Sequence, residues 1–75
     1  MTLADLNIAQ IATIIGFTDE DISLKLLEMG CLPGEKIVIE KIAPLGDPIA
    51  VRVLDYTLSM RKQEATTVLV RLNKN

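Results

Sequence analysis

Few side chains in this chain of 75 residues could do chemistry, and we find no catalytic set among them. There is no histidine, so the commonest general base and metal ligand is missing. Cys31 is the only thiol, and a lone cysteine between Gly30 and Leu32 is more typical of a small buried hydrophobe than of a nucleophile. We therefore predict no catalytic residue and no enzyme; a hydrolase or redox role would require an exposed Cys31 with a lowered pKa.

Metal and nucleotide sites are equally poorly supported. Asp19, Glu20 and Asp21 could attract a hard cation, but acidic residues are ordinary in the first turn of a helix, where the helix dipole is positive. A transition metal ion would need imidazole, thiolate or clustered carboxylate ligands, and the sequence offers no convincing set. The Gly46-Asp47 pair lacks the glycine-lysine pattern of a phosphate loop. We expect no metal site and no cofactor.

Composition favours one small cytoplasmic domain over residues 1–75. Hydrophobic residues make up 49% of the chain with one Phe and one Tyr, so Ile, Leu and Val must form the core. A net charge of −2 with scattered Lys and Arg argues against nucleic acid as a partner. One cysteine allows no internal disulfide, which fits a reducing compartment. The sequence contains no apolar run of about 20 residues and no signal peptide, so we expect no membrane insertion.

Residues 21–34 predict the element around which the rest is organised, a short helix that turns into a strand. Thr18 is the expected N-cap, Gly30 can end the helix in a left-handed conformation, and Pro33 cannot continue it. A helix of about ten residues is marginal alone in water, so it must lie on a sheet. Its apolar face is formed by Ile22, Leu26, Leu27 and Met29.

Alternating apolar residues predict five short strands, at 10–17, 35–43, 48–54, 57–60 and 67–72. The first has aliphatic residues on both faces and is expected to be covered on both sides for part of its length. In the second, the alternation slips near Glu40, which predicts a bulge that turns Ile42 inward. Single helical turns are expected at residues 2–7, through Leu3 and Leu6, and at 61–65. The pattern predicts a mainly β fold, a small and partly open SH3-like barrel.

Four segments stand out by their order and spacing between Leu3 and Val70: LLEMGCLPG at 26–34, IAPLGDPI at 42–49, LSMR at 58–61 and Glu64-Ala65. In these segments the chain resembles the FeoA family of ferrous iron transport accessory proteins. The resemblance implies an SH3-like fold and a cytosolic, non-enzymatic role beside the large membrane GTPase permease that imports Fe(II). The alternative is a stand-alone relative of the SH3-like domains fused to metal-dependent transcriptional regulators.

Some positions depart from the family pattern. Ala9 and Asp55 stand where glycine is usual, so we expect backbone strain at both. Lys25 replaces the usual arginine, Cys31 a larger aliphatic residue and Leu24 a charged one. These differences affect which partner the surface would recognise more than they affect membership of the family.

A partner-binding surface is the remaining functional prediction. Leu24, Leu27 and Cys31 would form a small apolar patch if Leu24 is exposed; alternatively, Leu24 packs against Leu3, Leu6 or the Pro33 turn. Tyr56, in the turn before the fourth strand, has the aromatic ring and polar tip that suit an interface; packing as a lid over the core is the alternative. The predicted occupant is the cytosolic part of the permease, with a second copy of the chain as a weak alternative. The candidate residues are Leu24, Lys25, Leu27, Cys31 and Tyr56.

Overall fold

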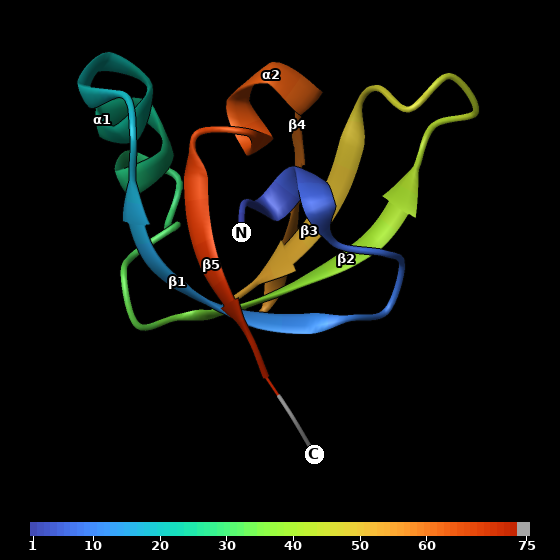
Figure 1. Ribbon diagram of the computed structural model, residues 1–75, viewed down its shortest axis with the longest axis horizontal. Helices are drawn as coiled ribbons and strands as arrows, with labels where there is room; N and C mark the ends of the chain where they lie inside the picture. The colour runs from blue at the N-terminus through green and yellow to red at the C-terminus, as the bar shows by residue number, and fades with distance from the viewer. Residues whose placement is uncertain (74–75) are drawn as a thin grey trace.

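In the computed structural model, which describes residues 1–73, the chain forms one five-stranded antiparallel sheet in the order β4-β3-β2-β1-β5 (Figure 1). Its elements are η1 (Leu3–Asp5), β1 (Ile11–Phe17), α1 (Glu20–Glu28), β2 (Lys36–Ile42), β3 (Ile49–Val53), β4 (Tyr56–Met60), α2 (Lys62–Ala65) and β5 (Val68–Leu72). The predicted mainly β fold is confirmed. The sheet remains open, because the end strands β4 and β5 do not pair with each other.

The core consists of aliphatic side chains on the inner face of the sheet, as the alternation predicted. Leu3 and Leu6 are both buried, so the predicted N-terminal turn closes one side of this core. Burying apolar surface is the main stabilising term in a domain of this size. The sheet contributes Ala12, Ile14, Ile37, Ile39, Ile49, Val51, Val53, Met60, Val68 and Val70.

Two strands contain bulges. The β2–β3 register shifts between Ile39 and Lys41, which confirms the predicted bulge, and Ile42 packs against the core. The β1–β5 register shifts between Ile14 and Gly16, which the sequence did not indicate. On the outward face of β1, Ile11 and Ile15 are exposed and Thr13 is half-buried.

Two non-glycine residues adopt the left-handed conformation. Ala9 has φ +72°, as its glycine-like position predicted. At the β3–β4 turn the strained residue is Leu54, with φ +56°, and not Asp55. Val53 pairs directly with Tyr56, so the turn is Leu54-Asp55 and Tyr56 is already the first residue of β4. The predicted place of Tyr56 within the turn is therefore wrong.

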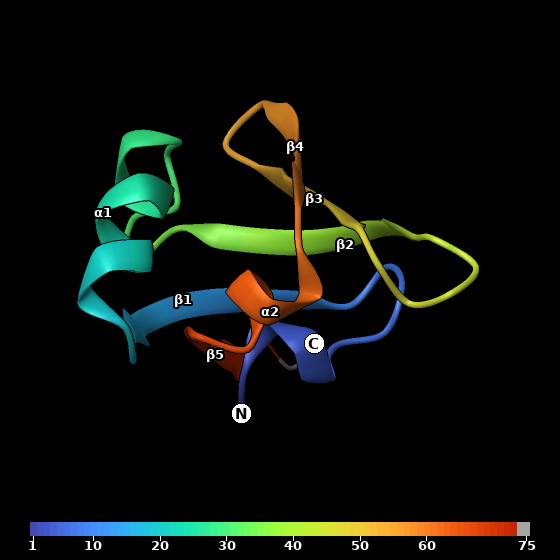
Figure 2. The ribbon, with the colours of Figure 1, turned by 90° about the horizontal axis from the view of Figure 1, so that it is seen from above.

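Helix α1 lies at one end of the sheet, next to the end of β1 and the start of β2 (Figure 2). Its N-cap is Asp19, whose carboxylate accepts a hydrogen bond of 2.9 Å from the Ile22 N–H. The predicted cap, Thr18, instead donates its backbone N–H to the Thr67 carbonyl and extends the pairing of β1 with β5. The cap is therefore Asp19, and α1 starts one residue later than a Thr18 cap would give.

Candidate functional site

Leu24 is the most exposed apolar side chain on α1. Leu26 is completely buried, and Ile22 and Met29 pack against the core, whereas 63% of Leu24 is accessible to solvent. The alternative in which Leu24 packs against Leu3, Leu6 or the Pro33 turn is therefore wrong. Leu24 lies one helical turn before the half-buried Leu27, so the two side chains share one side of the helix.

Cys31 does not belong to that patch. The structure buries it completely, and its backbone N–H donates to the Leu26 carbonyl at 3.0 Å. Burial raises the pKa of the Cys31 thiol, because the charged thiolate is poorly solvated there. The predicted buried hydrophobe is confirmed, and the exposed thiol that an enzyme role would need is not what the structure shows.

Tyr56 closes onto the C-terminal end of α1. Its hydroxyl donates a hydrogen bond to the Met29 carbonyl, one of the carbonyls that a helix leaves without a partner in its last turn. This close approach depends on Gly30, because a Cβ at that position would overlap the Tyr56 hydroxyl oxygen and lie 3.3 Å from Cδ1 of Leu54. Gly30 also has φ +97°, a conformation that side chains disfavour.

Lys25 connects α1 to α2. Its Nζ lies 2.5 Å from Oε2 of Glu64, and the other carboxylate oxygen of Glu64 accepts the Arg61 N–H at 2.9 Å. The hydrogen bond from Lys25, and then that from the Arg61 N–H, hold the pKa of Glu64 below its usual range. The charge of Lys25 is thus paired, while 60% of its side chain remains exposed.

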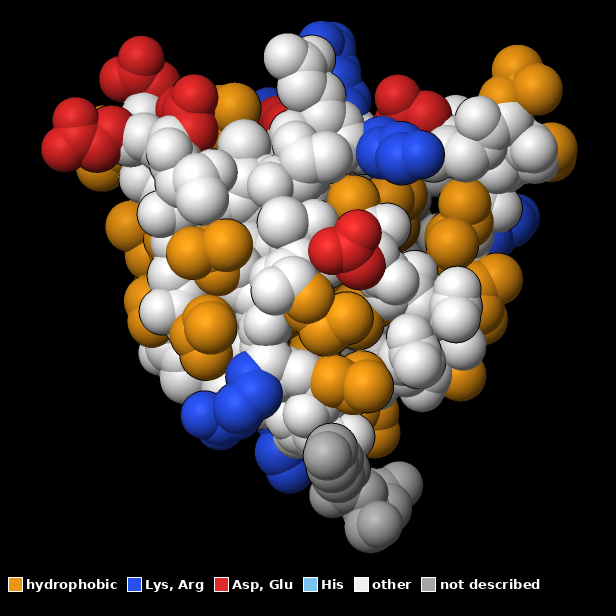
Figure 3. Space-filling view, viewed as in Figure 1, with side chains coloured by type: hydrophobic (Ala, Val, Ile, Leu, Met, Phe, Trp, Pro, Cys, Tyr) orange, Lys and Arg blue, Asp and Glu red, His pale blue; other side chains and the backbone are white. Residues whose placement is uncertain are grey.

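These contacts define what we call the α1 surface: Leu24 and Leu27 along the helix, and Leu54 and Tyr56 at its C-terminal end. Leu54 is half exposed and was not among the predicted residues. The β3–β4 turn lacks a glycine, and this feature of the sequence could have indicated that Leu54 lies in an exposed turn. In Figure 3 acidic side chains gather at the corner where α1 begins, and Glu20 and Asp21 lie one helical turn before Leu24.

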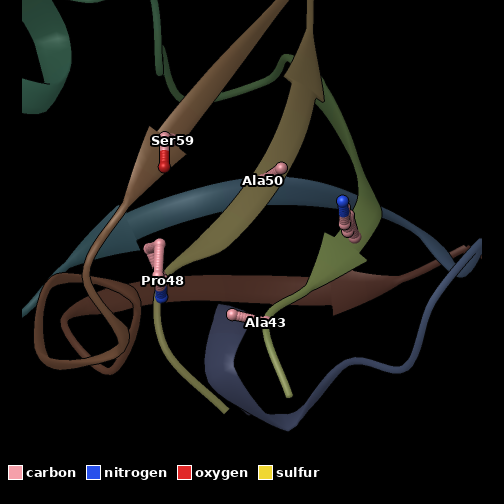
Figure 4. Close-up of a pocket in the computed structure, with 5 residues that line it drawn as sticks. Ala43, Pro48, Ala50 and Ser59 are labelled. Atoms are coloured by element: carbon pink, nitrogen blue, oxygen red, sulfur yellow. The ribbon is translucent and has the colours of Figure 1, made fainter. Parts of the chain in front are cut away.

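A shallow hollow on the outer face of the sheet was also missed (Figure 4). Its volume is about 260 Å³, near the lower limit of about 300 Å³ for small-molecule pockets, so it could take one side chain. Next to it the β2–β3 loop exposes 97% of Leu45. The sequence could have indicated this exposure, because Leu45 is surrounded by turn-forming residues. The lining residues are Lys41, Ala43, Pro48, Ala50 and Ser59.

Residues 1–73 contain neither a metal-binding cluster nor a membrane-spanning helix. No three His, Cys, Asp or Glu side chains are grouped so that they could hold a metal ion. No helix in the same range is both long and apolar enough to cross a membrane.

Comparison with known proteins decides the family. The FeoA domain profile matches residues 1–72. The chain belongs to the FeoA family. The resemblance found in the sequence is thereby confirmed, and both turn elements that carried it, 26–34 and 42–49, lie within the matched range.

Among its FeoA relatives, a curated Fe(2+) transport protein A/Fe(2+) transporter FeoB fusion protein of Porphyromonas gingivalis is 34% identical over 73 residues. The match covers 96% of this chain but only 9% of that protein. The NMR structure of an FeoA-like protein from Clostridium acetobutylicum superposes with a TM-score of 0.92 at 37% identity, covering 100% of this chain and 88% of the other. The crystal structure of Stenotrophomonas maltophilia FeoA complexed with zinc, described as a prokaryotic SH3 domain protein, gives a TM-score of 0.84 at 29% identity and covers 95% and 89%.

Thiol labelling should distinguish a buried from a reactive cysteine in this FeoA domain. We expect Cys31 to resist modification in the folded protein at neutral pH, because it is inaccessible and its raised pKa leaves little thiolate. Labelling should become complete when urea unfolds the chain. Rapid stoichiometric labelling of the folded protein at pH 7 would contradict the burial.

The Lys25–Glu64 ion pair should make stability depend on pH. A lowered pKa in the folded state means that the unfolded chain binds the proton more readily, so the stabilisation is complete above about pH 4.5 and is lost as the pH falls further. At pH 7 we expect Glu64→Gln to lower the free energy of unfolding by about 1 kcal/mol, a modest value because Lys25 is largely exposed. Urea unfolding at several pH values measures this.

Glu28→Gln is the matched control, since Glu28 is exposed and has no ion-pair partner among the described residues. The difference between the wild type and Glu64→Gln should shrink between pH 5 and pH 3, as follows from the ordinary carboxyl pKa of about 4.3. A difference that stays constant over that range would show that the ion pair is not the cause.

Proposed function

We propose that this FeoA domain is a non-enzymatic adaptor of ferrous iron uptake. It acts in the cytosol, where its α1 surface docks on the cytosolic part of a membrane Fe(II) transporter that carries a GTPase domain. The observation that carries the proposal is the exposure of Leu24 on a helix whose opposite side is fixed in the core. The fusion of the two transport proteins in the Porphyromonas gingivalis relative supports such a partner.

A fixed helix suits this role because docking then requires little additional ordering. Leu26 anchors α1 in the core, Lys25 holds it to α2, and Tyr56 holds its C-terminal end. Preorganised side chains bind more tightly because less conformational entropy is lost on association. An apolar residue presented in this way, one helical turn after two acidic residues, resembles the central contact of an interface more than a solvated helix face.

The adaptor would act by binding one conformation of the transporter more tightly than another. A partner with equal affinity for both states shifts nothing, however tightly it binds. We therefore expect affinity for the transporter's cytosolic domain to differ between its GTP-bound and GDP-bound states.

The experiment is a titration of the transporter's cytosolic domain with wild-type protein and with Leu24→Asp. We expect Leu24→Asp to weaken binding about 30-fold, the loss typical of an interface hot spot of about 2 kcal/mol. Leu45→Asp is the control, because it changes another exposed leucine, on the β2–β3 loop at the far end of the molecule from α1 (Figures 1 and 2).

Unchanged affinity of Leu24→Asp would rule out the α1 surface as the docking site. If no complex forms in any nucleotide state, in detergent or in membranes, the adaptor role itself fails. The alternative partner, a proline-rich or extended segment of a metal-dependent regulator, should be titrated in parallel.

A further inference from the structure

We propose that the free edge of β4 pairs with the same edge of a second copy of this chain, giving a weak, two-fold symmetric dimer with one continuous sheet. This inference does not depend on the adaptor role. It rests on a difference between the two edge strands of the sheet, β5 and β4.

The edge of β5 is covered and that of β4 is not. Thr2 forms a bridge with Leu69, and the Val70 N–H donates to the Met1 carbonyl at 3.0 Å, so the start of the chain occupies the outer side of β5. Strand β4 pairs only with β3 within residues 1–73. Unpaired backbone groups along a strand edge are a template for another strand.

Strand β4 also lacks the features that normally prevent such pairing. Exposed edges are usually blunted by charged residues, proline or a bulge. The sequence Tyr56-Thr57-Leu58-Ser59-Met60 contains no charge and no proline, and its register with β3 runs without a shift. By contrast, the β1–β5 and β2–β3 pairings each contain a register shift.

The direction of the free backbone groups follows from the turn. Val53 and Tyr56 flank a two-residue turn, so they form a hydrogen-bonded pair, and bonded and non-bonded pairs alternate from there. Tyr56, Leu58 and Met60 are therefore bonded to β3. Thr57 and Ser59 direct their N–H and C=O groups away from the sheet.

One register uses both of these residues and the whole strand. With the two-fold axis at Leu58, Thr57 lies opposite Ser59 of the second copy, and Tyr56 opposite its Met60. Just beyond the strand ends, Asp55 then lies opposite Arg61 of the second copy. The two-fold axis generates this pair of opposite charges twice. Neither side chain belongs to an ion pair among the described residues. A register shifted by two residues loses this charge match and leaves part of β4 unpaired.

The dimer must be weak, because five residues of strand edge bury less than the roughly 1,200 Å² of a standard stable interface. We therefore expect a reversible rise of the apparent mass toward that of the dimer as the concentration increases toward about 1 mM, the range of weak contacts. Sedimentation equilibrium measures this. Amide exchange at Thr57 and Ser59 should slow over the same range.

Charge exchange tests the register. Arg61→Asp and Asp55→Arg should each weaken association at least tenfold, by placing like charges opposite each other, and the double variant should restore it. Arg71→Asp, on the exposed side of β5, is the control and should leave association unchanged. Thermal unfolding checks that each variant is folded. A protein that stays monomeric to about 1 mM, or a dimer indifferent to the single exchanges, would overturn the proposal.

Discussion

Leu26→Ala is expected to lower the free energy of unfolding by about 3 to 4 kcal/mol, within the range found for leucine deletions in well-packed cores. Leu26 is the completely buried residue of α1, and a short helix cannot close the space that the deletion leaves. The loss is large against the roughly 5–15 kcal/mol that stabilises a typical domain. Urea unfolding followed by circular dichroism provides the measurement.

The neighbouring leucines serve as controls on the same helix. Leu24→Ala should change stability by no more than about 0.5 kcal/mol, as is usual at exposed positions, and Leu27→Ala should fall in between. Equal losses at Leu24 and Leu26 would mean that α1 presents a different side to the core. The same series separates stability from docking, which should depend on Leu24.

Gly30→Ala should cost about 2 to 3 kcal/mol. Of this, about 1–2 kcal/mol is the strain of a left-handed alanine, and the rest is the displaced Tyr56 and its lost hydrogen bond. Gly34→Ala is a close match, since Gly34 has a similar φ of +95° but no atom within 4 Å of an added Cβ. Gly34→Ala should therefore lose only the stability that corresponds to the strain of a left-handed alanine. Thermal or urea unfolding compares the two variants.

A double substitution isolates the contact with the tyrosine. In a Tyr56→Ala background the overlap with the hydroxyl disappears, so the additional loss at Gly30 should fall toward the value at Gly34, with only the 3.3 Å approach to Cδ1 of Leu54 remaining. If Gly30→Ala and Gly34→Ala were equally destabilising in the wild type, the closure of Tyr56 onto α1 would not contribute to stability.

Local chemistry made much of the fold predictable. The inward residues of β2, β3 and β5 followed from strict alternation, and the Ile39–Lys41 bulge followed from its interruption. For the strands the signal lies within a few neighbouring residues. The left-handed conformation of Ala9 followed instead from the family resemblance, in which glycine is usual at that position.

The failures have different causes. Thr18 was the predicted cap, but the carboxylate of Asp19, one residue later, accepts the first-turn N–H of Ile22. Asp55 was the better candidate for a positive φ, but the register of Val53 with Tyr56 gives that conformation to Leu54. Helical spacing put Cys31 next to Leu24, yet α1 ends at Glu28 and the chain then turns Cys31 inward. The predicted surface residues also stood on both sides of α1, which periodicity alone could not separate.

The way in which the first residues lie along β5 affects how the protein should be prepared. Since the Met1 carbonyl and Thr2 are part of the sheet, an affinity tag joined ahead of Met1 would begin on an ordered edge and could add spurious strand contacts there. Purification with a cleavable tag, removed before any solution measurement, avoids this artefact.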